Sequence, residues 1–487
     1  MKKTLLTSLL GLIGLTAFAQ IKNTSFDEKK ENAKWPESWA IKEIPGSTVQ
    51  IDDNIKFSGS SSLKISTNEG VEPSKFASFS QTIPLNLDKT SRATISVYLK
   101  TENLMGSAAI WCQVWDDKNK SVGFVNLGSQ NEPVKGTNDW KKYSMTLILD
   151  RTAKRLVLGG YSMGAGSTWF DDIAFESAQA NSKPASKEVK NYIAVVNAII
   201  KDNSIYTDSL NWGAINADIE ELGKGLETTA DAQMLTNFML QKLRAAGDNH
   251  SFFQPKVAAQ QYASGNTSQQ KPTFKLLDNH IGYIMVPSYG STDTETGKAF
   301  ANEIQGFIKK LDTENTIKGW IVDLRPNTGG NMHPMIAGLG PIIGRGTLGY
   351  FVKGKSKTPW YYTKEGEGAG KGITVKIDQP YELKNPNSKV AVLIGPRTSS
   401  SGEMTTVSFI GKKNAKLFGE QSGGYTTANT GYPLPDGSFL YLASSYVADR
   451  NMKKYIGKIT PDVVVKPVAG EDTVLKTAET WVLDSNP

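Results

Sequence analysis

Apolar and polar residues alternate through the first third of the chain. Apolar side chains stand at every second position of Ala93-Ile95-Val97-Leu99 and Ile110-Cys112-Val114. The same spacing recurs in Ser61-Leu63-Ile65 and Tyr143-Met145-Leu147-Leu149. A period of two places side chains on one face of a β-strand. Because turn residues separate these short segments, the pattern predicts an all-β sandwich over residues 20–178.

The period changes after a polar segment, residues 179–187, which contains Asn181-Ser182-Lys183-Pro184 and is typical of a linker. Val189, Ile193, Val196 and Ile200 then recur three or four positions apart, as on one face of a helix. A second helix is expected over about residues 230–246, before a capping glycine at position 247. We therefore expect residues 188–270 to be a helical segment that begins a second domain.

From residue 271 onward, strands and helices alternate. The apolar strand 281–286 precedes a helical stripe at 300–311, and the apolar strands 320–324 and 390–394 each precede a glycine- or serine-rich turn. This order predicts an α/β domain over residues 271–487. Turns at the carboxyl ends of such strands are where ligands bind.

Composition adds three limits. A chain of 487 residues is expected to form two or three domains. Its net charge of +7 falls to +5 without Lys2 and Lys3, which is too small an excess to indicate a nucleic-acid site. Cys112 is the only cysteine, so the chain can form neither an internal disulfide nor a thiolate metal cluster.

The first 19 residues have the form of a signal peptide. A basic start is followed by an apolar run, Leu5 to Leu15, and by the small-residue site Thr16-Ala17-Phe18-Ala19. The apolar run is too short to span a bilayer, and no cysteine follows the cleavage site to carry a lipid. We expect export to the periplasm or the extracellular space; a buried N-terminal helix is the alternative.

Two turns could carry chemistry. In Thr398-Ser399-Ser400-Ser401-Gly402-Glu403, a serine stands at a helix N-terminus, where free N–H groups stabilise an oxyanion. The alternative is a helix cap with Glu403 completing a capping box. In Asn327-Thr328-Gly329-Gly330, paired glycines can present N–H groups to a ligand, or can form an ordinary turn.

A serine nucleophile needs a base, and the chain has three histidines. His280 stands at a turn into a strand and is expected to be structural, and His333 follows the paired glycines. His250 follows the helix cap in Gly247-Asp248-Asn249-His250-Ser251. It is the leading candidate for the base, although a lone histidine is more often structural.

Residues 186–487 resemble the C-terminal processing (tail-specific) serine peptidase family, including its tricorn-core and retinoid-binding-protein branches. The resemblance rests on motifs in the family's order: Asp248-Asn249-His250-Ser251, Gly282-Tyr283-Ile284, the segment Asp323 to Gly330, Ser399-Ser400-Ser401-Gly402-Glu403, and Ile459-Thr460-Pro461-Asp462. It implies a crotonase-like ββα peptidase fold. Relatives often insert a PDZ domain, but the segment from Ser251 to Ile281 is too short for one.

The resemblance also implies roles for individual residues. The nucleophile stands three positions before the motif glutamate, which points to Ser400, with the neighbouring serines as alternatives. The oxyanion hole would use the N–H of Ser401 and that of Gly329 or Gly330.

One branch of the family uses a lysine base, but Tyr425 stands at that position here. The resemblance to the tricorn-like branch therefore implies His250 as the base. Asp449 would be the third residue, although a hairpin turn there is an equal alternative.

These roles imply an exported serine endopeptidase that needs no metal or organic cofactor. The first alternative is an inactive binding protein of the same fold, in which Tyr425, Tyr432 and Tyr441 would line a hydrophobic pocket. The second is an esterase that uses the same Ser400–His250 pair.

The front domain resembles jelly-roll carbohydrate-binding and galactose-binding-like modules, in the segments Asn23 to Asp27, Trp35 to Trp39, Ser58 to Leu63 and Trp169 to Ile173. Trp111 and Trp115 would lie on the face opposite the core, as in a sugar-stacking surface, or would pack under a loop. The resemblance also implies that Asp171-Asp172 could bind a structural calcium ion.

Overall fold

The structure is a computed structural model that describes residues 21–29, 34–72, 75–130, 134–177, 181–265, 270–468 and 470–484. The expected signal peptide, residues 1–19, lies outside the described residues. The chain divides into two compact units. The first holds the residues up to Ile193 together with Asn211–Ala245, and the second holds Ala194–Leu210 together with Ala246 onward.

The first unit is built around one long strand, β5, Ser91–Trp115. Its first half pairs with β7, Val134–Leu149, and β9, Gly166–Ser177, and its second half pairs with β6, Ser121–Asn126, and β8, Arg155–Met163. The strand therefore belongs to both layers of the sandwich. The other strands extend these layers in the order β1-β4-β8 and β9-β3-β2. They are β1, Ala40–Lys42; β2, Ser47–Asp52; β3, Ser62–Thr67; and β4, Phe76–Pro84.

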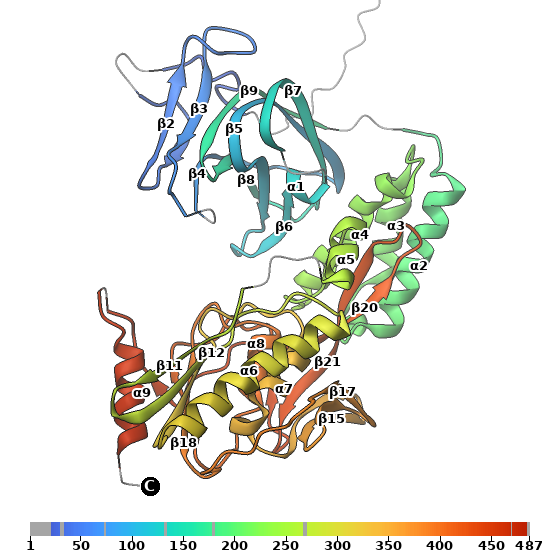
Figure 1. Ribbon diagram of the computed structural model, residues 1–487. Helices are drawn as coiled ribbons and strands as arrows, with labels where there is room; N and C mark the ends of the chain where they lie inside the picture. The colour runs from blue at the N-terminus through green and yellow to red at the C-terminus, as the bar shows by residue number, and fades with distance from the viewer. Residues whose placement is uncertain are drawn as a thin grey trace, which may run out of the picture. The chain divides into compact units, whose positions relative to one another are not determined.

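Figure 1 shows the strands of this sandwich, and the burial of alternate side chains along β5 confirms the pattern expected from the sequence. The side chains of Ile95, Val97, Ile110 and Cys112 are fully buried in its core. Residues 20–178 were predicted to form an all-β sandwich, and the strands of the first unit form one. Burial also raises the pKa of the Cys112 thiol far above its usual range, so this cysteine is an apolar core residue.

The helices between the two sheet-rich regions are α2, Lys187–Asn203; α3, Trp212–Gly223; and α4, Thr229–Ala245; short helical turns are α1, Leu127–Gln130, and η1, Thr207–Ser209. Salt bridges tie α3 and α4 to the sandwich, from Asp218 to Arg151 and from Lys242 to Asp150. The sequence alone grouped these two helices with the second domain. Their contacts place them in the first unit, and α2 runs from one unit into the other.

The second unit contains a six-stranded sheet in the order β11-β12-β13-β18-β19-β23. All its neighbours are parallel except β11 and β12. Its strands are β11, Thr273–Leu277; β12, Ile281–Met285; β13, Gly319–Asp323; β18, Lys389–Ile394; β19, Ala415–Gly419; and β23, Val463–Val464.

Both faces of this sheet are covered. Ile321 and Leu393 pack against α9, Thr473–Leu483, and Trp320 and Val392 point to the opposite face. That face carries α6, Thr294–Glu314, and α7, Met332–Ile343 (Figure 1). The central strands are apolar on both sides because both sides are buried, which explains why they read as continuous apolar runs in the sequence.

A second, antiparallel sheet of this unit has the order β10-β21-β14-β15-β16-β17, with β20 and β22 also paired to β21. Its strands are β10, Phe252–Gln254; β14, Gly346–Lys353; β15, Ser356–Thr363; β16, Gly366–Ala369; β17, Gly372–Lys376; β20, Thr427–Pro433; β21, Phe439–Asp449; and β22, Lys454–Tyr455. The remaining helical segments are α5, Lys256–Ser264; η2, Asp278–His280; and α8, Ser401–Val407.

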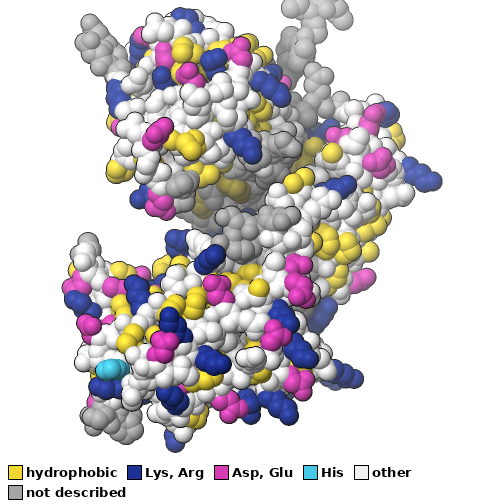
Figure 2. Space-filling model, viewed as in Figure 1, with side chains coloured by type: hydrophobic (Ala, Val, Ile, Leu, Met, Phe, Trp, Pro, Cys, Tyr) yellow, Lys and Arg dark blue, Asp and Glu magenta, His cyan; other side chains and the backbone are white. Residues whose placement is uncertain are grey.

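The surface carries both signs of charge. On the face that Figure 2 shows, Lys and Arg side chains are interspersed with Asp and Glu, and no broad area of one sign is visible there. No helix in the described ranges combines the length and the apolar character needed to cross a bilayer.

Two glycines of the second unit should respond oppositely to alanine. A Cβ on Gly282 would lie 2.5 Å from the ring of Trp320, its partner across β12 and β13, whereas a Cβ on the exposed Gly306 of α6 meets nothing. We expect Gly282→Ala to lower the free energy of unfolding of this unit by about 1–3 kcal/mol through overpacking. Gly306→Ala should raise it by about 0.5–1 kcal/mol, because glycine disfavours a helix interior. Calorimetry of both variants checks this, and equal effects would contradict it.

Candidate active site

Ser400 stands in the turn between β18 and α8, with backbone angles φ 52° and ψ −119°. A positive φ is costly for a residue with a side chain, by about 1–3 kcal/mol, and persists only where the surroundings impose it. Two hydrogen bonds hold the turn here. The N–H of Ser399 donates to the carbonyl of Asn327 (3.0 Å), and that of Ser400 donates to Oε2 of Glu403 (2.9 Å).

The hydroxyl of Ser400 lies 2.9 Å from Nε2 of His250. The other ring nitrogen, Nδ1, lies 2.9 Å from the carbonyl oxygen and 3.0 Å from Oγ1 of Thr427, the first residue of β20. Since a carbonyl only accepts hydrogen bonds, we assign the proton of a neutral ring to Nδ1. Nε2 then carries the lone pair and accepts from the Ser400 hydroxyl, which is the arrangement of a general base and its nucleophile.

Burial lowers the pKa of His250, and the bond to Thr427 and the charge of Asp248 act in the opposite direction. The net effect keeps the ring neutral near pH 7, as a base must be. The ring of Tyr425 stands edge-on to the imidazole, with centroids 5.5 Å apart. Tyr425 is 40% exposed.

The neighbouring serines are engaged elsewhere. The hydroxyl of Ser401 donates to the carbonyl of Gly330 (2.6 Å). Ser399 Oγ lies on the side of Gly423, where a Cβ would overlap it. Within the described residues, Ser400 is the only one of the three serines whose hydroxyl meets a histidine.

The other two histidines lie in different surroundings. His280 is an exposed residue of η2. His333, in the first turn of α7, places Nδ1 2.9 Å from both carboxylate oxygens of Glu367. Glu367 is fully buried, and burial raises its pKa, while the contact with His333 acts in the opposite direction. Neither histidine has a serine hydroxyl partner among the contacts of the described residues.

Of the three N–H groups predicted to form the oxyanion hole, that of Gly329 differs from those of Gly330 and Ser401. The N–H of Gly329 donates to Oδ1 of Asn327 (3.0 Å), so it is already engaged. Gly329 instead provides space: a Cβ there would lie 2.8 Å from Cβ of Ser400. The N–H groups of Gly330 and Ser401 have no acceptor in the part of the chain that the structure describes. They remain the candidate donors to an oxyanion.

The structure does not bring Asp449 to His250, which corrects the expectation of a late acidic partner. Asp449 lies at the end of β21 and is 2% exposed. Its carboxylate accepts from the N–H groups of Asn451 (2.8 Å) and Lys453 (3.0 Å) and from the hydroxyl of Tyr455 (2.9 Å). Asp449 thus caps a hairpin turn, the alternative that the sequence left open.

Glu403 connects the Ser400 turn to the segment that leads into β20. The side chain is fully buried. Oε2 accepts from the N–H groups of Ser400 (2.9 Å) and Tyr425 (2.8 Å), and Oε1 accepts from Ser422 Oγ (2.5 Å) and the N–H of Gly424 (2.9 Å). Burial raises the pKa of Glu403, and these four bonds act against that rise. The sequence indicated the bond to Ser400 through the capping box, but not the other three.

Thr427 and Asn429 are site residues that the sequence did not indicate. Thr427 holds Nδ1 of His250, and Nδ2 of Asn429 donates to the carbonyl of His250 (2.8 Å). Their side chains are two apart on β20, which also pairs with β21. Neither residue belongs to a recognisable motif. The one signal in the sequence is that they follow Tyr425 by two and four positions.

The two tryptophans of the front domain differ in their surroundings. Trp111 lies over Gly159 of the neighbouring strand β8, where a Cβ would approach its ring to 3.0 Å. The ring of Trp115 is covered by the guanidinium of Arg155, 4.8 Å from its centroid, and its Nε1 is buried without a partner in the described residues. Trp111 is therefore the better placed of the two for stacking on a ligand.

The Asp171-Asp172 pair does not fit a calcium site as it lies. Asp171 accepts three backbone N–H groups, from Phe57 (2.8 Å), Ser58 (3.1 Å) and Asp172 (2.7 Å). The oxygens of Asp172 accept the hydroxyls of Ser25 and Ser58, each at 2.9 Å. Burial raises the pKa of Asp171 to about 6, with a further contribution from the charge of Asp172. A cation would have to displace these donors.

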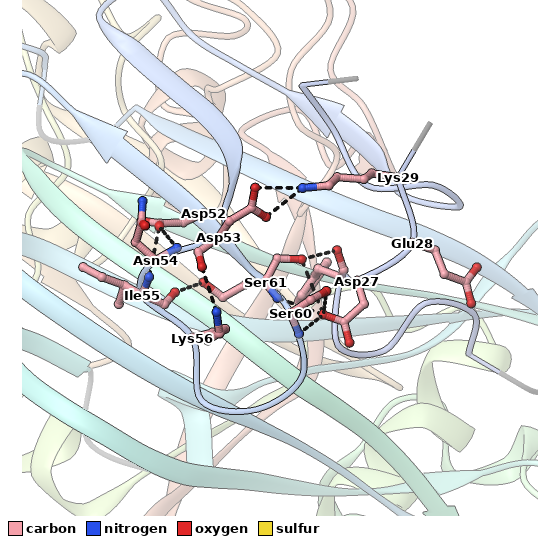
Figure 3. Close-up of polar contacts among 12 residues, drawn as sticks. Asp27, Glu28, Lys29, Asp52, Asp53, Asn54, Ile55, Lys56, Ser60 and Ser61 are labelled. Carbon is pink, nitrogen blue, oxygen red and sulfur yellow. Dashed lines mark hydrogen bonds and ion pairs between the residues drawn. The ribbon is translucent and has the colours of Figure 1, made fainter. Parts of the chain in front are cut away.

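The acidic residues of the adjoining loop are also engaged with protein donors (Figure 3). Asp27 accepts the N–H groups of Ser60 (2.7 Å) and Ser61 (2.9 Å), and Asp53 pairs with Lys29. No group of three or more His, Cys, Asp or Glu side chains suited to a metal ion occurs in the described ranges. Asp27 thus caps N–H groups of the loop, and Asp53 is held by an ion pair.

The second unit is similar in sequence to known peptidases. The model of peptidase family S41 matches residues 280–465. A nisin-resistance protein of Lactococcus lactis subsp. lactis is 31% identical over 276 residues, which cover 56% of this chain and 82% of that protein. The carboxy-terminal processing protease CtpA of Bacillus subtilis (strain 168) is 25% identical over 214 residues, 42% of this chain and 41% of its own length.

Among solved structures, that of a lipoprotein from Streptococcus agalactiae covers 61% of this chain and 96% of its own, with 25% identity and a TM-score of 0.49. The matched family range contains Gly330, Ser400 and Thr427, and His250 precedes it. The S41 match and the extent of the similarity to the nisin-resistance protein together show that this chain belongs to peptidase family S41.

Proposed function

We propose that this chain is an exported serine endopeptidase that hydrolyses peptide bonds through an acyl-enzyme on Ser400. One observation carries the proposal: the Ser400 hydroxyl lies 2.9 Å from Nε2 of His250, whose Nδ1 is held by the carbonyl of Thr427. This tautomer leaves Nε2 free to accept the hydroxyl proton. Export rests on the signal-peptide form of residues 1–19, and sequencing of the mature N-terminus, expected at Gln20, would test it.

The first step is acylation. Nε2 of His250 takes the proton as Ser400 Oγ bonds to the peptide carbonyl carbon, and the π electrons move onto the carbonyl oxygen. The N–H groups of Gly330 and Ser401 would receive that oxyanion. The protonated Nε2 then gives its proton to the leaving amine as the C–N bond breaks, and the acyl-enzyme remains.

The second step is hydrolysis of the ester. His250 takes a proton from water, whose oxygen attacks the acyl carbon, and then returns the proton to Ser400 Oγ as the acid product leaves. Each step leaves Nδ1–H on the Thr427 carbonyl. The ring thus exchanges a proton at Nε2 while the bond at Nδ1 fixes its orientation.

An inactive binding protein is the main alternative. A fold that had lost peptidase chemistry would be free to separate Ser400 from His250 with packed side chains. The short Ser400–His250 distance and the positive φ of Ser400 both favour the enzyme, because strain of this kind is retained where a function uses it. An esterase that uses the same pair is distinguished only by tests with substrates.

Labelling with a fluorophosphonate probe tests the reactive pair. We expect the mature wild-type protein to label, Ser400→Ala to lose labelling entirely, and His250→Ala to label about 10²–10⁴-fold more slowly, because general-base catalysis contributes rate factors of that size. His280→Asn is the control, since His280 is exposed and asparagine tolerates its positive φ. Labelling that survives Ser400→Ala would show that the nucleophile is a different residue.

The pH dependence of labelling follows from the environment of His250. Burial lowers its pKa, and only the neutral ring accepts the Ser400 proton, so the rate should fall as pH drops through that pKa. We expect the midpoint of the acid limb below the ordinary histidine value of about 6.5. Stopped-time labelling from pH 4.5 to 8.5 measures it; a midpoint clearly above that value would contradict a buried, neutral base.

We further propose that the front sandwich binds a glycan through Trp111, which would localise the peptidase. The support is the half-buried indole of Trp111 over Gly159, on the outer face of β5, with Gln113 two positions along the same strand. An indole face stacks on the apolar face of a sugar ring, and an amide can bond its hydroxyls.

Affinity electrophoresis in soluble polysaccharides tests this binding. We expect the wild-type chain to be retarded by at least one polysaccharide and Trp111→Ala to lose the retardation. Trp35→Ala is the control: Trp35 is 45% exposed, but its Nε1 bonds to the carbonyl of Val49 at a different part of the sandwich. Equal losses in both variants would indicate non-specific binding through exposed indoles.

A further inference from the structure

The imidazole of His250 has no carboxylate on either nitrogen: Nδ1 meets the carbonyl and hydroxyl of Thr427, and Nε2 meets Ser400. Catalysis nevertheless requires the ring to become a cation in a buried place. A buried cation is costly unless a negative charge lies close to it. A nearby carboxylate that does not touch the ring could still supply that charge through space.

Asp248, two residues before His250, is such a group. It is 2% exposed. Its Oδ1 accepts the N–H groups of His250 and Ser251, both at 2.9 Å, and its Oδ2 accepts the hydroxyl of Ser251 at 2.5 Å. These donors are neutral, and no lysine or arginine pairs with Asp248 in the described residues. Three neutral donors therefore surround the carboxylate of Asp248.

The other groups around the pair do not supply this charge. Burial and the charge of Asp248 raise the pKa of Tyr206 to about 12, so its phenol supplies no negative charge near pH 7. From the segment before β20, Tyr425 presents its ring edge to His250, and Glu403 lies behind it with four donors of its own. Asp248 is the carboxylate whose charge acts on His250.

We infer that Asp248 is the acid of this site: it orients His250 through the turn at its N–H and supplies, through space, the negative charge that stabilises the imidazolium. Asp248 is a positioning residue, because it touches neither the ring nor the substrate. The inference rests on the proposed Ser400–His250 chemistry. It replaces the late acid that the family resemblance implied at Asp449.

Asp449 provides a matched control. Both aspartates are 2% exposed, and each accepts two backbone N–H groups and one hydroxyl. Asparagine keeps the shape and one acceptor oxygen but removes the charge. Asp248→Asn and Asp449→Asn should therefore disturb their turns to a similar degree, while only the first removes charge beside His250.

The test is the titration of His250 itself, followed by NMR of Cε1-labelled histidine in the full mature chain, which contains only three histidines. We expect Asp248→Asn to lower the pKa of His250 by about one unit, since a nearby opposite charge shifts a pKa by about 1–3 units. Asp449→Asn should leave it unchanged. In parallel, the acid limb of fluorophosphonate labelling should move to lower pH in Asp248→Asn, with a slower plateau because the base is weaker.

An unchanged His250 titration in Asp248→Asn, or an equal shift in both variants, would overturn the inference. If the wild type does not label, the proposed peptidase chemistry fails, but the titration still decides whether Asp248 acts on the ring. If Asp248→Asn does not fold, Ser251→Ala takes its place. That variant removes a donor from Asp248 and leaves its charge, so the pKa of His250 should hold or rise, and a fall would overturn the inference.

Discussion

A carboxylate that is wholly buried must find donors within the protein, and Glu403 finds four on two separate segments. Two of them are the N–H groups of Ser400 and Tyr425, so the turn of the nucleophile and the approach to β20 share one carboxyl group. The segment after Tyr425 carries Thr427, which holds the ring of His250. The backbone of Ser400 and the orientation of His250 thus depend on the same buried side chain.

This arrangement separates two tasks that one acid performs in a Ser–His–Asp triad. Orientation of the ring comes from neutral groups of β20: Thr427 at Nδ1 and Asn429 at the His250 carbonyl. Stabilising charge would come from Asp248, on the histidine's own turn. A carbonyl partner fixes the tautomer as firmly as a carboxylate does, but it offers less to the imidazolium. Burial lowers the pKa of His250, and the bond from Nδ1 to the Thr427 carbonyl acts against that shift.

The features that could be predicted from the sequence are those that depend on residues close together along the chain. The period-two segments of β5 and the apolar runs of β13 and β18 predicted strands. Burial of one face makes every second residue apolar, and burial of both faces makes the whole segment apolar. Ser400 and His250 stood in short motifs, and the structure brings their side chains together. The expectation of an acid at Asp449 failed because order along the sequence does not say which way a side chain points from a hairpin.

Other features of the site depend on contacts between distant segments. The sequence suggested the N–H of Gly329 as an oxyanion donor. In the structure this N–H already donates to the side chain of Asn327. Thr427 belongs to no motif, and only the pairing of β20 with β21 brings it to His250. Likewise, the sequence predicted a helix over about residues 230–246, now α4, but could not say on which unit it packs; Lys242 shows this through its partner Asp150.

The order of the two units along the chain has a consequence for dissection of the protein. The chain enters the second unit at Ala194, returns to the first at Asn211, and leaves it again after Ala245. No single cut therefore releases either unit whole. A fragment that ends in the linker near residue 187 would lack α3 and α4, and its complement would carry those helices without their sandwich. Separate expression of the front part therefore requires α3 and α4 to stay with the sandwich.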